Sequence, residues 1–126
     1  MADKDISTPG PHHRISIEPN PHRVIVEIDG IEIASTTAAL TLREAGYPPV
    51  EYIPRNDIAM SRLTRTDHVS HCPYKGDASY VSLSGGGERL VHAAWSYEAP
   101  YPAVSQIEGY LAFYPERVGA IIESDS

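Results

Sequence analysis

The chain of 126 residues contains one cysteine and one phenylalanine, and it has no long apolar run. The single cysteine, Cys72, excludes an intramolecular disulfide and a four-cysteine zinc site, and it is typical of a reducing compartment. No segment approaches the roughly 18 apolar residues of a membrane span, and the N-terminus has no apolar signal core. We therefore expect a cytoplasmic protein without a membrane partner.

Basic residues are also few, with 10 Lys and Arg against 17 Asp and Glu and a net charge of -7. Because nucleic-acid binding depends largely on neutralising phosphates, this balance argues against a nucleic-acid partner. The length fits one compact domain whose core needs no metal or disulfide. We expect residues 1–8 to form a disordered N-terminus, residues 9–122 a single β domain, and residues 123–126 a short acidic tail.

Strand patterns predict a mainly β, antiparallel fold. Residues 23–35 give the clearest signal, because apolar residues alternate on both sides of Asp29-Gly30, a pair that supplies the positive φ angles of a type I′ hairpin turn. One helical turn capped by Asn56 and another over residues 104–109 are also expected. Further strands are predicted over residues 14–18, 39–43, 50–53, 78–83 and 90–97, the last two forming a hairpin around Gly85-Gly86-Gly87, and a final strand over residues 110–114.

Aromatic side chains gather beside prolines in three segments, residues 46–54, 71–80 and 95–115. The chain has eight tyrosines and one tryptophan, and a core that needs only apolar volume would use phenylalanine and leucine instead. Tyrosine and tryptophan add a hydrogen-bonding end to a large apolar body, which suits the wall of a partly hydrated pocket or an interface.

Six blocks in these segments and upstream carry a family resemblance: IEPNP (residues 17–21), GYPP (46–49), HCPYKGDASY (71–80), AWSY (94–97), PYP (100–102) and GYLAFYP (109–115). In order and spacing they resemble the family catalogued as domain of unknown function 427, which some catalogues label nucleotidyltransferase-like. The likeness covers roughly residues 9–118.

This resemblance implies a compact β-tent, in which two antiparallel sheets meet at an angle, similar to methionine sulfoxide reductase B and the ligand-binding domain of cereblon. Those relatives join their sheets through a four-cysteine zinc site. Because this chain has only Cys72, we expect no zinc pin.

The residue chemistry favours a pocket for a small anionic or aromatic ligand, built from the hairpin that starts at Cys72 and from residues 95–101. Lys75 is the predicted anion partner, and Asp77 and Ser79 are predicted to orient the ligand through polar contacts. The predicted walls are aromatic: Tyr74, Tyr80, Trp95, Tyr97 and Tyr101.

An enzyme in the same pocket is the alternative. Cys72 or a bound water would attack, Asp77 would act as base, and Lys75 would stabilise developing negative charge. Nucleotidyl transfer usually needs paired carboxylates for Mg²⁺, and the acids of this chain are scattered. Purely structural roles stay open as well, with Cys72 as a small buried thiol and Lys75 as a solvated charge.

Two further interpretations concern metals and partner chains. His68, His71 and Cys72 are ligand types, but neighbours on an extended strand point to opposite faces, so we expect no metal and no other cofactor. Residues 55–75 lean basic and form either an anion-binding rim or a solvated loop. Finally, the aromatic surface is alternatively a homodimer interface without any ligand.

Overall fold

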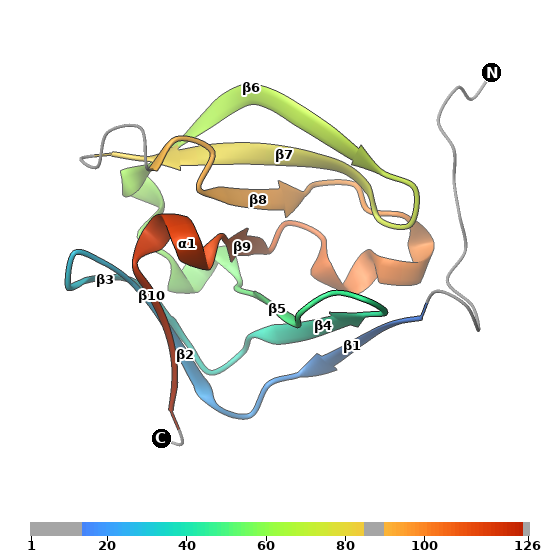
Figure 1. Ribbon diagram of the computed structural model, residues 1–126, viewed down its shortest axis with the longest axis horizontal. Helices are drawn as coiled ribbons and strands as arrows, with labels where there is room; N and C mark the ends of the chain where they lie inside the picture. The colour runs from blue at the N-terminus through green and yellow to red at the C-terminus, as the bar shows by residue number, and fades with distance from the viewer. Residues whose placement is uncertain (1–13, 85–89, 125–126) are drawn as a thin grey trace.

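The computed structural model describes residues 14–84 and 90–124. The predicted disordered N-terminus, the tip at Gly85-Gly86-Gly87 and the last two residues of the predicted tail lie outside these ranges. The described residues form three small antiparallel sheets joined by short helical turns (Figure 1). The predicted mainly antiparallel β fold is confirmed, with three sheets where the family resemblance implied two.

The strands combine residues that are distant in the sequence. The first sheet has the order β1 (Ile15–Pro19), β4 (Leu40–Glu44), β5 (Val50–Tyr52), and the second has β10 (Ala120–Ser124), β2 (Arg23–Ile28), β3 (Ile31–Thr36). The third has β6 (Leu63–Cys72), β7 (Gly76–Leu83), β8 (Ala94–Tyr97), β9 (Leu111–Phe113). Short helical segments cover Arg55–Asp57, Met60–Arg62, Pro102–Ile107 and, as α1, Pro115–Val118. In the part of the chain described, none of the helices has the length and apolar character needed to cross a membrane.

The β2–β3 hairpin forms where the sequence predicts it. Asp29 and Gly30 take φ angles of 51° and 80°, and Ile28 pairs with Ile31 across the turn. Alternate side chains of β2, among them Val24 and Val26, are fully buried. The period-2 pattern of this segment therefore specified both the hairpin and its buried face.

The β10 strand was not predicted, and of β6 the sequence indicated only the end, as the strand before the turn at residues 75–77. β6 lies at the edge of its sheet and is mostly exposed and polar, so its sequence lacks the alternation that marks a half-buried strand. β10 pairs with β2 and extends to Ser124. Glu123 and Ser124, assigned to the tail, therefore belong to a sheet, and Glu123 accepts a hydrogen bond from the buried amide of Asn20.

The predicted cap at Asn56 is wrong. Asn56 lies inside the turn Arg55–Asp57, which follows Pro54. Asp57 ties this turn to β3 instead, because its Oδ2 accepts a hydrogen bond of 2.7 Å from Thr36 Oγ1. A long-range contact thus replaces the local cap that the sequence suggested.

At β8 and β9 the third sheet has buried side chains on both faces, and this arrangement positions the site. One face packs Ala94, Leu111 and Phe113 against the second sheet. The other face directs aromatic residues toward the first sheet, seen below the third in Figure 1. This second core cluster is only partly closed: its buried members are Leu42, Tyr52, Ala78, Tyr97, Val104, Ile107 and Ala112, and the side chains packed at its edge include Cys72, Tyr80 and Trp95.

Candidate functional site

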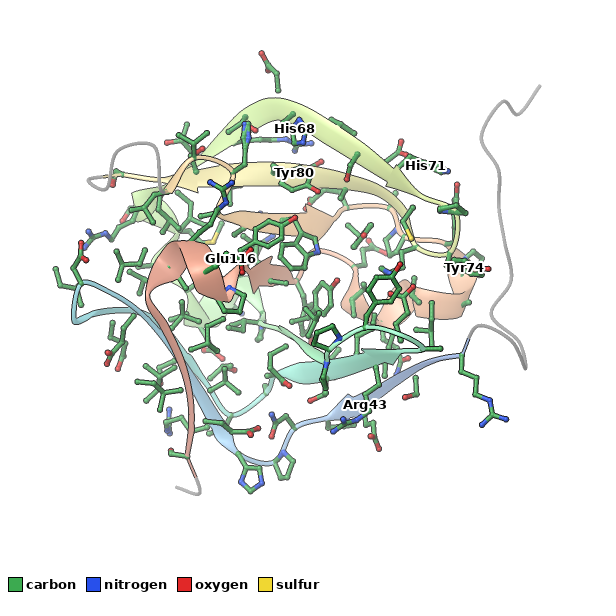
Figure 2. The ribbon with its side chains drawn as sticks, viewed as in Figure 1. Arg43, His68, His71, Tyr74, Tyr80 and Glu116 are labelled. Carbon is green, nitrogen blue, oxygen red and sulfur yellow. The ribbon has the colours of Figure 1, made fainter. Side chains whose placement is uncertain are left out.

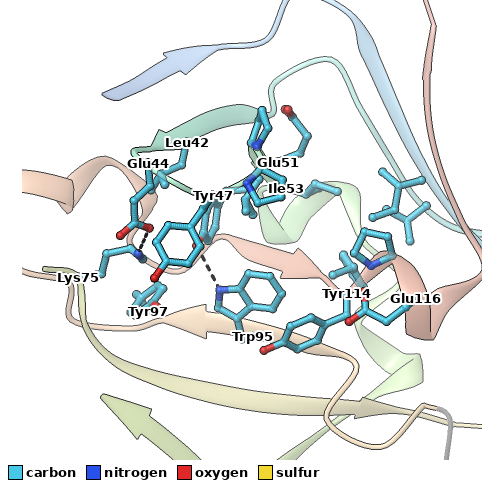
Figure 3. A pocket seen from close by; sticks show the side chains of 18 of the residues that line it. Leu42, Glu44, Tyr47, Glu51, Ile53, Lys75, Trp95, Tyr97, Tyr114 and Glu116 are labelled. Carbon is cyan, nitrogen blue, oxygen red and sulfur yellow. Dashed lines mark hydrogen bonds and ion pairs between the residues drawn. The ribbon is translucent and has the colours of Figure 1, made fainter. Parts of the chain in front are cut away.

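A cavity of about 770 Å³ opens at the edge of the second core cluster (Figure 3). Small-molecule sites commonly measure about 300–1,000 Å³, so the cavity has a suitable size for an organic ligand. Segments from all three sheets and from α1 contribute to its walls. Its aromatic lining residues are Tyr47, Tyr52, Tyr80, Trp95, Tyr97, Phe113 and Tyr114.

Strand register explains why the aromatic rings converge. Tyr80 on β7 lies opposite Trp95 on β8, and Trp95 lies opposite Ala112 on β9. Ala78 is in turn opposite Tyr97. Because residues that are directly paired project on the same face, Tyr80, Trp95 and Tyr97 share one face of the sheet, on which the large rings alternate with small buried alanines.

Trp95 is held in place by two tyrosines. Its Nε1 donates a hydrogen bond of 3.1 Å to the Tyr52 hydroxyl, and the two rings meet edge to face with centroids 6.3 Å apart. The Tyr114 ring lies 4.4 Å from the indole, centroid to centroid. With its N–H engaged by Tyr52, Trp95 offers the cavity mainly the apolar and π surface of its ring.

Three of the tyrosines that line the cavity, Tyr52, Tyr97 and Tyr114, have raised pKa values. Burial is the main cause that raises the pKa values of Tyr52 and Tyr97 above the ordinary value for tyrosine. Burial also raises the pKa of Tyr114, and a hydrogen bond with Tyr80 adds to this rise. The environment of the cavity therefore disfavours a new negative charge on these walls.

Lys75 lines the cavity, and it is not the solvated charge that the sequence left open as its structural role. It is buried, at 8% exposure, and its Nζ lies 2.5 Å from Glu44 Oε1 at the end of β4. The sequence did not reveal this ion pair, because Glu44 is 31 residues upstream and gives no local signal. A buried carboxylate already neutralises this ammonium.

The remaining predicted polar residues lie outside the cavity lining. Asp77 Oδ1 lies 2.9 Å from His71 Nδ1, on the opposite side of β7 from Ala78. Ser79 Oγ accepts a hydrogen bond of 2.9 Å from Arg65 Nη2. The Tyr101 ring meets His71 edge on, with centroids 6.2 Å apart.

Cys72 lines the cavity and is half-buried against the second core cluster. It pairs with Gly76, whereas Asp77 pairs with His71, so Cys72 and Asp77 belong to opposite faces of the sheet. The predicted attacking group, Cys72, and the predicted base, Asp77, are thus not brought together.

Tyr74, a predicted wall residue, is not part of the cavity lining. It lies at the β6–β7 turn, far across Figure 2 from the lining residue Glu116.

Apart from Lys75, the basic side chains of residues 55–75 are outside the cavity lining. The first of them, Arg55, donates to the Gly109 carbonyl at 2.7 Å and pairs with Glu98. The His68 ring contacts the Tyr80 ring at a tilt of 55°, with a centroid separation of 4.6 Å, and its centroid lies 4.8 Å from that of the His92 ring. Across the described residues, no three His, Cys, Asp or Glu side chains are grouped so that they could hold a metal ion.

Several lining residues were missed as site candidates. Tyr47, Tyr52 and Tyr114 fall within the predicted aromatic segments, so composition marked their segments but not their roles. Glu51 and Glu116 carry no local motif; Glu51 reaches the cavity from β5 and Glu116 from the first turn of α1. Of the ionisable Lys, Arg, Asp and Glu residues described, the lining holds Glu44, Glu51, Glu116 and Lys75, and is therefore acidic.

Residues 16–124 match the family model described as a domain of unknown function, DUF427. The match spans most of the chain, so the protein belongs to this family, and the resemblance seen in the sequence blocks is confirmed. No curated protein matches the chain.

Proposed function

We propose that this DUF427 domain binds a small organic ligand with an apolar or aromatic body in the cavity between the first and third sheets. The observation that carries this proposal is the convergence of tyrosines and the single tryptophan, from separate strands, on one cavity of about 770 Å³. Such aromatic walls provide large contact areas with few rotatable bonds, which limits the entropy lost on binding.

The rigidity of the walls supports this proposal. Tyr52 is 1% exposed, Tyr97 is 6% exposed, and Tyr52 fixes the indole of Trp95 by a hydrogen bond. Tyr47, in contrast, is 65% exposed at the edge of the cavity. A ligand that covers Tyr47 would remove apolar surface from water without requiring the core to reorganise.

The aromatic part of the original ligand hypothesis gains support from these walls, and the anionic part loses support. An anion partner needs an available cation, and Lys75 is already paired with Glu44 inside the protein. Breaking that pair to bind an anion would leave Glu44 without its ammonium partner in a buried position.

The test uses the single indole N–H resonance of Trp95 in a ¹H–¹⁵N spectrum. We expect hits from a library of neutral aromatic fragments to shift this resonance together with backbone amides of residues 44–53 and 113–116. Tyr110, which is outside the cavity lining, provides a matched control: Tyr110→Phe should retain the hits, whereas Trp95→Leu should weaken them. Fragments that shift only the outer face of β6 and β7, or no hits with the folded protein, would refute the proposal.

A further inference from the structure

We infer that the ligand of this cavity is a cation, an alkylated ammonium group that contacts the ring faces of Trp95 and Tyr114 and the carboxylate of Glu116. This inference rests on the proposed function and adds the charge of the ligand to it. It reverses the charge of the anionic ligand considered from the sequence, because that ligand depended on Lys75 as its partner and Lys75 is paired with Glu44.

The charge balance of the lining is the first argument. Glu44 and Lys75 form an ion pair with side chains 11% and 10% exposed, so together they add little net charge. The other charged lining residues described are the carboxylates Glu51 and Glu116. An anionic ligand would therefore enter a site with an excess of like charge, whereas a cation would be attracted.

The two carboxylates differ in their availability. Glu51 Oε1 accepts hydrogen bonds of 2.8 Å from Thr41 Oγ1 and 3.0 Å from Asn20 Nδ2, which hold it toward the first sheet. Glu116 is exposed, in the first turn of α1, and lies beside Tyr114 in Figure 3. Its neighbour Arg117 is not a lining residue and donates to the Val91 carbonyl.

The ring faces are the second argument. A cation within about 6 Å of an aromatic centroid is attracted by the ring quadrupole, and tryptophan is the strongest such partner. The indole N–H of Trp95 is hydrogen-bonded to the Tyr52 hydroxyl, and the centroids of the Tyr114 ring and the indole are 4.4 Å apart. The rings of Trp95 and Tyr114 therefore form a fixed aromatic corner. Glu116 at the rim of this corner adds the Coulomb attraction that an ammonium ion would use.

A matched set of probes separates charge from shape. Choline, 3,3-dimethylbutan-1-ol and 3,3-dimethylbutanoate share a trimethylated head and differ in charge. We expect choline to bind at least about fivefold more tightly than the neutral alcohol, and the carboxylate to bind most weakly, measured by the fluorescence and the indole resonance of Trp95. Equal binding of choline and the alcohol, or preferred binding of the carboxylate, would overturn the inference while the proposed function stands.

Charge variants supply the control. Glu116→Gln should weaken choline binding about three- to fivefold and leave the alcohol unchanged. Glu32→Gln removes the same charge from an exposed position on β3, outside the cavity lining, and should leave both affinities unchanged. An equal loss in both variants would show only a general field effect and would contradict a contact with Glu116. If no library fragment and none of the three probes affects Trp95, the proposed function itself fails.

Discussion

Lys75 Nζ lies 2.5 Å from Glu44 Oε1, and this ion pair links the end of β4 to the turn between β6 and β7. The two side chains are about nine-tenths buried, so this is an interior ion pair that joins the first and third sheets beside the cavity. Backbone bonds support the turn, since Lys75 N–H donates to the Cys72 carbonyl and Tyr101 N–H donates to the Lys75 carbonyl. Lys75 and Glu44 therefore both stabilise the fold and form part of the cavity wall.

Lys75→Met should lower the free energy of unfolding by about 3 kcal/mol, because it leaves the Glu44 carboxylate buried without its ammonium partner. Urea denaturation measures this loss. Combining it with Glu44→Gln should cost less than the sum of the single losses, because neither charge is then uncompensated. Arg43→Ala is the control, since Arg43 and Glu18 form an exposed pair and the expected change is within about 0.5 kcal/mol. A loss as small for Lys75→Met as for Arg43→Ala would contradict the buried pair.

The sequence specified those parts of the fold that depend on local chemistry. Asp29-Gly30 determines its hairpin because the positive φ angles are a property of these two residues. The predicted helix cap at Asn56 was wrong, because the turn around Asn56 is held instead by a hydrogen bond between Asp57 and Thr36 in a distant strand. Most of β6 escaped prediction because an exposed edge strand has no buried face to impose alternation.

The candidate site could be predicted only in part, because some of its residues are marked by local sequence and others are brought in by long-range contacts. Trp95, Tyr97 and Tyr80 stand in aromatic segments of β7 and β8, and their shared face follows from register once the strands are known. The sequence could not predict Glu44 as the partner of Lys75, because only the packing of the first sheet against the third brings these two residues together. The sign of the charge in the cavity thus depended on a tertiary contact.

Gly30→Val should reduce the free energy of unfolding by about 1–3 kcal/mol, because a β-branched residue resists a positive φ. No described atom beyond its chain neighbours lies within 4 Å of a Cβ built on Gly30, so the effect reports backbone strain rather than a clash. Gly30→Asn should cost clearly less, since asparagine tolerates this region. Thermal unfolding of the two variants compares them, and equal melting temperatures would show that φ at position 30 carries no strain.

Tyr52 and Tyr97 should resist ionisation as the pH rises, because burial raises their pKa values in the folded state. Their contribution to stability is fully present below the unfolded pKa of about 10 and is lost as the pH increases beyond it, since the unfolded chain releases these protons first. Absorbance at alkaline pH should show some of the eight tyrosines titrating only as the protein unfolds. Tyr97→Phe should remove one tyrosine from this late phase. Reversible titration of all eight near pH 10 in a folded protein would contradict the burial.

Alkylation of Cys72 should report occupancy of the cavity. Cys72 lines the cavity, is half-buried, and is the single cysteine of the chain, so mass spectrometry detects one site of labelling. Iodoacetamide should label the folded protein more slowly than the unfolded chain, and saturating choline should slow labelling further, because a ligand and the reagent need the same space. At the same concentration, 3,3-dimethylbutanoate should protect little, since it carries the charge that the lining disfavours.

Cys72→Ala should retain choline binding and cost about 1 kcal/mol in stability, as expected for a small loss of packing. Loss of binding in Cys72→Ala, or a labelling rate that choline leaves unchanged, would contradict the role of Cys72 as a passive wall residue of the ligand cavity.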